Sequence, residues 1–133
     1  MEFLMSAAKT DVKLKVGVVG LGIGRSHVQG FQNNPNSVVM AICDKSKDRL
    51  EDVSKEYGVD GLYDDLEEMI DKENLDILSI ATPNSLHAPQ TIMGFEKGLH
   101  VLCEKPMAMS VAETREMIVA GEKAGKNLMI KFN

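Results

Sequence analysis

The 133-residue sequence has no tryptophan, few aromatic residues and two cysteines, Cys43 and Cys103. Two isolated cysteines form neither a disulfide framework nor a CxxC pair. No group of His, Cys and acidic residues has the spacing of metal ligands. We therefore expect a cytoplasmic protein with free thiols and no bound metal.

Positive charge is also scarce, because 15 Lys and Arg stand against 20 Asp and Glu, a net charge of −5. This balance argues against nucleic acid and against an anionic membrane surface as partners. No apolar run reaches the roughly 18 residues that a membrane helix needs. Residues 1–12 do not have the pattern of a signal peptide. We interpret them as an N-terminal tail and 13–133 as one domain.

Apolar, strand-like runs alternate with helical patterns along this domain. The alternation is typical of βαβ units, and unbroken apolar runs are typical of strands buried on both faces of a parallel sheet. Strands are expected at 14–19, 38–43, 61–63, 77–81, 100–103 and 128–132. Helices are expected at 24–33, 47–57, 64–71, 86–97 and 111–124. The sequence therefore predicts a doubly wound α/β Rossmann fold with strand order 3-2-1-4-5-6.

A glycine-rich turn follows the first expected strand, with Gly20, Gly22 and Gly24 ahead of a helix. Glycines at this place let a pyrophosphate approach the free N–H groups of a helix N-terminus. The usual spacing is G-x-G-x-x-G, whereas this turn reads G-x-G-x-G. The simpler interpretation is a turn whose glycines serve packing alone.

Asp44 ends the second expected strand about 20 residues after the glycine turn, where a carboxylate binds the adenosine ribose of a dinucleotide. An acidic residue there favours NAD, since it repels the 2′-phosphate of NADP. Lys45, Lys47 and Arg49 lie close by in the sequence and would accept that phosphate, so NADP stays open. The simpler interpretation makes Asp44 a solvated strand-end residue or a helix cap.

A turn at Thr82, Pro83 and Asn84 follows the fourth expected strand, across the switch point from the first. Its backbone is therefore expected to face the nicotinamide half of a dinucleotide. Asn84 and Ser85 would otherwise only cap the next helix, and His87 would be a surface residue. His27 is expected to pack near the glycine turn.

The fifth expected strand ends in Cys103-Glu104-Lys105-Pro106, at the sheet edge where open α/β sheets bind ligands. A lysine beside the nicotinamide suits proton transfer to or from a substrate hydroxyl. The alternative is a strand-end turn with a solvated ion pair. Pro106 is also predicted to follow a cis bond.

Together these motifs resemble the N-terminal domain of the Gfo/Idh/MocA oxidoreductase family. The matching segments are VGVVGLGIGRSH, AICD, DILSIATPNSLHAP, GLHVLCEKPMAMSVAET and NLMIKFN. The resemblance implies a domain that binds NAD or NADP, in an enzyme that oxidises a hydroxyl or reduces a ketone of a sugar, cyclitol or related polyol. It implies a catalytic role for Lys105, a pocket-shaping role for Glu104 and a ribose contact for Asp44. Thr82, Pro83, Asn84 and His87 would line the cofactor cleft.

The chain departs from the family pattern in two places. Its glycine turn is one residue shorter, so Arg25 takes the place of the third glycine unless a gap before Ile23 puts Gly24 there. The expected cofactor contacts at this turn are therefore Gly20, Gly22, Ile23, Gly24 and Arg25, with Lys45 near Asp44.

The resemblance also implies that family members continue into a substrate domain, which we expect to lie outside these 133 residues. We expect the longer protein to be a homo-oligomeric enzyme and this domain alone to be nearly inactive. The alternatives are a dinucleotide-sensing module without catalysis and an interaction domain with a degenerate cleft.

Overall fold

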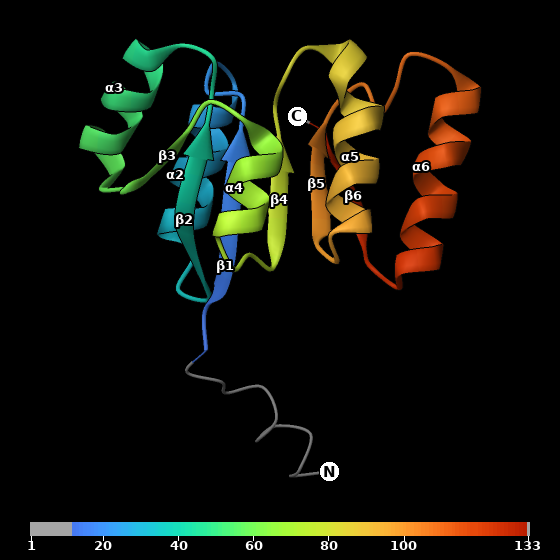
Figure 1. The fold of residues 1–133 in the computed structure, drawn as a ribbon, viewed down its shortest axis with the longest axis horizontal. Coiled ribbons are helices and arrows are strands. Elements are labelled where there is room, and N and C mark those ends of the chain that lie inside the picture. The colour runs from blue at the N-terminus through green and yellow to red at the C-terminus, as the bar shows by residue number, and fades with distance from the viewer. Residues whose placement is uncertain (1–11, 133) are drawn as a thin grey trace, which may run out of the picture.

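The computed structural model describes residues 12–132, so the predicted tail lies almost wholly outside the described residues. The described residues form a six-stranded sheet of order β3-β2-β1-β4-β5-β6, in which all neighbouring strands are parallel (Figure 1). This confirms the predicted doubly wound α/β fold. Because all strands run in one direction, their carboxyl ends meet at a single edge of the sheet.

The strands lie within one residue of their predicted bounds. They are β1 Leu14–Val19, β2 Ser37–Cys43, β3 Gly61–Tyr63, β4 Ile77–Ile80, β5 His100–Glu104 and β6 Leu128–Lys131. The difference that matters for function is in β5, which includes Glu104 and therefore places that carboxylate on the sheet itself.

The helices also follow the prediction, with one change of type. They are α2 Gly24–Asn33, α3 Lys47–Tyr57, α4 Leu66–Lys72, α5 His87–Glu96 and α6 Val111–Ala124. The expected helix at 86–97 is preceded by a separate 3₁₀ turn, η1 Asn84–Leu86. Side chains of Ser46, Asp65 and Ser110 cap α3, α4 and α6, so short-range capping chemistry sets these helix starts.

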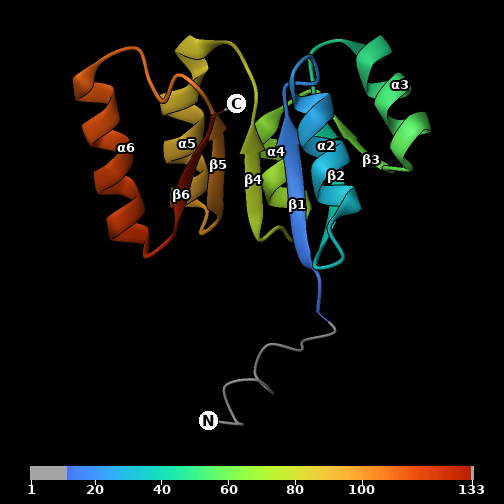
Figure 2. The same cartoon turned by 180° about the vertical axis from the view of Figure 1, so that it is seen from behind.

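Two helical layers cover the sheet. Helices α4, α5 and α6 lie on one face (Figure 1), and α2 and α3 lie on the other (Figure 2). Each face has its own apolar core, one around Met69, Leu78 and Phe95, the other around Val28 and Val53. Within the described residues, no helix is long and apolar enough to cross a membrane.

The apolar side chains of α6 are only partly buried. Met117 and Gly121 are buried, but Val111 and Ile118 are 68% and 45% exposed. The reason is that α6 flanks the end of the sheet and packs mainly on α5. A Cβ at Gly121 would lie 3.1 Å from the ring of Phe95, so the two helices approach closely there.

Candidate functional site

Four turns come together at the carboxyl edge of the sheet, the upper edge in Figure 1. They follow β1, β2, β4 and β5, and the residues that sequence motifs assign to a ligand site lie in these turns or at the adjoining ends of β5, α2 and α5. The candidate site residues are Gly20, Gly22, Ile23, Gly24, Arg25, Asp44, Lys45, Thr82, Pro83, Asn84, His87, Glu104 and Lys105.

The three glycines of the turn after β1 have different structural surroundings. Gly20 has a φ of +87°, and a Cβ there would lie 2.6 Å from the carbonyl carbon and oxygen of Ala81. Gly22 faces open space, because a Cβ added there would have no atom within 4 Å outside its own chain neighbours. A Cβ at Gly24 would lie 3.2 Å from Ala81 Cβ and 3.3 Å from Val18 Cγ1.

These are the roles of the dinucleotide-binding glycines: a tight turn, room for a pyrophosphate, and close packing of helix on strand. Gly24 takes the packing role, so it occupies the place of the third glycine in spite of the shorter spacing. Arg25 instead points to α3, where its Nε donates to Glu56 Oε2 at 3.0 Å.

The start of α2 suits an anion. Ile23 is the N-cap, and its side chain offers no hydrogen bond to the free N–H groups of the first turn. Those N–H groups and the positive end of the helix dipole lie beside the open space over Gly22. The turn therefore fits the pyrophosphate of a dinucleotide.

Asp44 is neither a solvated residue nor the cap of α3, because its side chain is 8% exposed and Ser46 is the N-cap. Its Oδ2 accepts from the N–H of Leu21 at 2.7 Å, and its Oδ1 accepts from the N–H of Ser46 at 2.7 Å. The carboxylate thus ties the end of β2 to the glycine turn. Each oxygen keeps a lone pair that can accept from a ribose hydroxyl.

Lys45 is directed away from Asp44. Its Nζ donates to the carbonyl oxygen of Asp64 at 2.8 Å, and it lines a cavity of about 830 Å³ along β3 together with Met40 and Tyr63. Arg49 lies nearer, with Nη1 3.8 Å from Asp44 Oδ2. Arg49 is therefore the cation that lies beside the Asp44 carboxylate.

His87 connects the turn after β4 with the turn after β5. The ring is buried, and its Nε2 lies 2.9 Å from the carbonyl oxygen of Thr82 while its Nδ1 lies 2.7 Å from that of Pro106. The interpretation of His87 as a surface residue is therefore wrong. Pro83 and Asn84 stay exposed at the sheet edge, and no side chain caps η1 or α5, so the capping role considered for Asn84 and Ser85 is wrong.

The turn after β5 separates a buried carboxylate from an exposed amine. Glu104 is 5% exposed, whereas the Lys105 side chain is exposed at the sheet edge. The Lys105–Pro106 bond is cis, which confirms the prediction. The simple solvated ion pair considered for this turn is wrong, because Glu104 lies inside the molecule.

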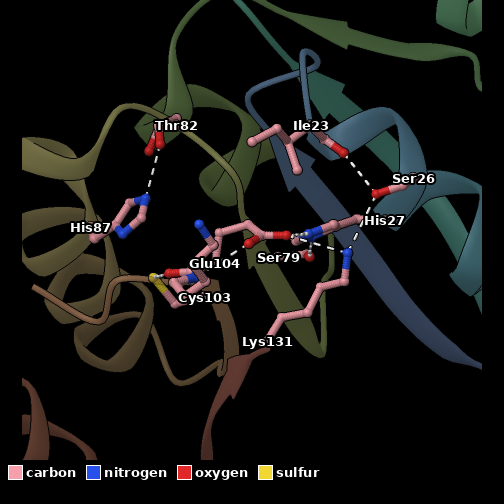
Figure 3. A network of polar contacts seen from close by, with 10 residues as sticks. Ile23, Ser26, His27, Ser79, Thr82, His87, Cys103, Glu104 and Lys131 are labelled. Carbon is pink, nitrogen blue, oxygen red and sulfur yellow. Dashed lines mark hydrogen bonds and ion pairs between the residues drawn. The ribbon is translucent and has the colours of Figure 1, made fainter. Parts of the chain in front are cut away.

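Glu104 belongs to a buried network that sequence patterns did not indicate (Figure 3). His27 Nδ1 lies 2.7 Å from Ser79 Oγ, and His27 Nε2 lies 2.8 Å from Glu104 Oε1. Lys131 Nζ lies 3.3 Å from the same carboxylate oxygen. The paired residues are 27 to 77 positions apart in the sequence and lie in α2, β4, β5 and β6, so no local motif could have grouped them.

Burial sets the charges of this network. It lowers the pKa of His27, and the hydrogen bond to Glu104 offsets only part of that effect. Burial acts to raise the pKa of Glu104, but hydrogen bonds from His27 and Lys131 outweigh it and lower the pKa. At neutral pH the ring is therefore neutral and the carboxylate ionised. Since a carboxylate only accepts, we assign the ring proton to Nε2, and Nδ1 accepts from Ser79.

The two cysteines are not part of the candidate chemistry. Burial raises the pKa of Cys43 to about 12 and that of Cys103 to about 11. Thiols with such values carry almost no thiolate at neutral pH and are poor nucleophiles.

The doubly wound sheet, the glycine turn and Asp44 define the class of the protein as a dinucleotide-binding Rossmann domain. The model of the Gfo/Idh/MocA family, described as an oxidoreductase family with an NAD-binding Rossmann fold, matches residues 14–132. The chain belongs to this family, and NAD is the family's cofactor.

Named relatives are sugar and cyclitol dehydrogenases. The chain is 31% identical over 131 residues to D-glucoside 3-dehydrogenase of Escherichia coli, covering 97% of this chain and 37% of that protein. It is 31% identical to myo-inositol 2-dehydrogenase of Thermotoga maritima, covering 90% of this chain and 36% of the relative. The chain thus spans little more than a third of these relatives.

Solved structures agree with the sequence matches. The WlbA dehydrogenase of Bordetella pertussis, crystallised with NADH and UDP-GlcNAcA, superposes with a TM-score of 0.84 at 31% identity, over 90% of this chain and 37% of that one. The cofactor-bearing fold is therefore shared with a protein whose complex contains NADH.

Proposed function

We propose that this chain is the cofactor domain of an NAD-dependent dehydrogenase that acts on a hydroxyl or ketone of a sugar, cyclitol or related polyol. The observation that carries the proposal is the glycine turn, where open space over Gly22 adjoins the uncapped start of α2. The dehydrogenases named above supply the substrate class. NAD, when bound, supplies the carbon that gives or takes the hydride.

One half of the sheet edge binds the pyrophosphate and the adenosine ribose. Backbone N–H groups from Gly22 to Arg25 bind the pyrophosphate, because the N–H of Leu21 already donates to Asp44, and Asp44 accepts from the adenosine ribose. The Asp44 carboxylate repels a 2′-phosphate and so favours NAD over NADP, whereas Arg49, with Nη1 3.8 Å from Asp44 Oδ2, is the cation that would accept such a phosphate.

The other half of the edge serves the nicotinamide. Thr82, Pro83 and Asn84 line one side, held in place by the His87 ring. Lys105 moves a proton to or from the substrate hydroxyl, and Glu104 holds the backbone beside it. This supports Lys105 as the catalytic residue of this domain.

The proposal extends to the setting of the protein. Two buried, unpaired thiols support a reducing compartment such as the cytoplasm. The net charge of −5 supports a small-molecule substrate over nucleic acid. Homo-oligomer formation by a longer protein stays a prediction.

A titration of the chain with NADH and NADPH tests the cofactor assignment. NADH fluorescence can be followed without a tryptophan background, because the sequence has no tryptophan. We expect NADH to bind more tightly than NADPH and Asp44→Ser to relax that preference. The matched control is Asp60→Ser, which changes an exposed aspartate just before β3, at the end of that strand away from Asp44.

The outcomes separate the competing functions. A folded chain that binds neither cofactor would favour an interaction domain with a degenerate cleft. Binding of NAD by a native protein that turns over no sugar or polyol would favour a sensing module.

A further inference from the structure

The buried network holds the backbone N–H of Lys105. The Lys105 N–H donates to Glu104 Oε2 at 3.2 Å, while the other oxygen of that carboxylate faces His27 and Lys131. Each of these three partners is a donor, so the ionised carboxylate accepts from a ring N–H, an ammonium and a backbone N–H.

The sheet register explains why Lys131 is the cation of this network. Glu104 and Lys131 are direct partners in the parallel pairing of β5 and β6. The carboxylate side chain is 6% exposed and the lysine side chain 35% exposed, so the ammonium covers the carboxylate from the solvent side. A nearly buried carboxylate needs such a partner, because desolvating a charge without one is costly.

The far side of Lys105 is held as well. The carbonyl oxygen of Pro106, the next residue, lies 2.7 Å from His87 Nδ1. The backbone of Lys105 is therefore held from β5 through Glu104, and the residue that follows it lies against the buried His87 ring at the start of α5. Only the rotamers of the exposed Lys105 side chain remain to be ordered when a substrate binds.

We propose that His27 and Lys131 are positioning residues for Lys105, acting through the Glu104 carboxylate; this inference rests on the proposed dehydrogenase function. His27 places one oxygen of Glu104 and Lys131 keeps the carboxylate charged and covered, which leaves the other oxygen for the Lys105 N–H. Preorganising the lysine in this way lowers the entropic cost of proton transfer.

A nucleophilic role for the network is excluded by burial. Ser79, His27 and Glu104 have the residue types of a hydrolytic triad, but Ser79 is completely buried in β4. A substrate cannot reach that hydroxyl, so the network acts on what surrounds it.

The test compares Lys131→Met, Lys131→Arg and the control Lys123→Met, which removes an exposed lysine from the last turn of α6. The first readout is the hydrogen exchange rate of the Lys105 amide, measured by NMR on the chain. The second is hydride transfer by the native protein, with kcat and the KM for NAD determined separately.

We expect Lys131→Met to speed Lys105 amide exchange and to lower kcat, each by about tenfold, with the KM for NAD within about twofold of the wild type. Lys131→Arg should restore both values, and Lys123→Met should leave both unchanged. An unaltered kcat in Lys131→Met, with hydride transfer intact in the wild type, would overturn the positioning role and leave the proposed function standing.

One measurement needs no variant and decides the matter if Lys131→Met does not fold. Nitrogen NMR of the wild-type chain at neutral pH should find a neutral His27 ring with its proton on Nε2. A ring protonated on Nδ1 alone would leave no donor toward the Glu104 carboxylate and would refute the network. A wild-type chain that does not bind NADH would refute the proposed function instead. The Lys105 amide exchange rate and the His27 tautomer would still test the positioning role in that case.

Discussion

Substituting the glycines of the turn one at a time should separate stability from cofactor binding. Gly22→Ala puts a methyl into open space, at a residue without positive φ. No contact in the free protein opposes this methyl, and the loss of glycine freedom in the unfolded chain stabilises the fold by about 0.4–1 kcal/mol. The methyl nevertheless occupies the approach of the pyrophosphate.

Gly20→Ala should have the opposite profile. The residue would be held at a φ of +87°, with its Cβ 2.6 Å from the Ala81 carbonyl group. The strained backbone costs about 1–3 kcal/mol, and forcing the methyl against the backbone costs about 1–3 kcal/mol more. The sum of about 2–6 kcal/mol is a large share of the roughly 5–15 kcal/mol by which a domain is stable.

Urea unfolding followed by circular dichroism gives the stabilities, and NADH fluorescence gives the affinities. We expect Gly22→Ala to weaken NADH binding by about tenfold or more with unfolding free energy equal to or above wild type. Gly20→Ala should lower the unfolding midpoint at an unchanged m-value. A Gly22→Ala chain that binds NADH as tightly as the wild type would refute the assignment of the open space to the pyrophosphate.

Three further predictions concern the buried groups. Cys43 and Cys103 should resist a thiol reagent at mildly alkaline pH until denaturant is added, because their pKa values are about 12 and about 11; rapid labelling of the native chain would contradict their burial. The pKa values of His27 and Glu104 are lowered in the fold, so the unfolded chain binds more protons than the folded one. The unfolding free energy should therefore fall as pH drops below about 6.5, the ordinary histidine pKa, and the Glu104 contribution should be lost at lower pH. Urea titrations over this pH range measure the change, and an unfolding free energy that does not vary with pH would count against both assignments. Lys131→Met should destabilise the chain by about 1–2 kcal/mol in the same assay, less than a fully buried pair because Lys131 is partly exposed.

Most of the fold was predictable because its signals are local. Apolar runs mark β1 and β2, Ser46 and Ser110 cap helices by short-range hydrogen bonds, and Gly125 ends α6 in the left-handed region. Burial is less predictable, because tertiary position decides it. The exposure of Val111 depends on α6 flanking the end of the sheet, which a helical period does not reveal.

The common location of the candidate site motifs at one sheet edge was predictable for a related reason. Each motif is weak alone, but in a parallel sheet every turn after a strand reaches the same edge, so a correct strand order brings Gly22, Asp44 and Lys105 together. The buried network was missed because its contacts follow from register. Glu104 on β5 is the direct partner of Lys131 on the neighbouring strand β6, and His27 contacts Glu104 from α2, on one face of the sheet.

The shorter glycine spacing also has a physical explanation in the packing of α2. The third glycine is needed because a side chain there would prevent the close approach of helix and strand. Distances measured from its Cβ position test whether a given glycine has this role. At Gly24 that position lies 3.2 Å from Ala81 and 3.3 Å from Val18, closer than an ordinary van der Waals contact. Arg25 lies one position further around the helix, and its side chain pairs with Glu56 on α3. Spacing in the sequence is therefore a proxy for a contact, and the contact identifies Gly24 as the third glycine of this turn.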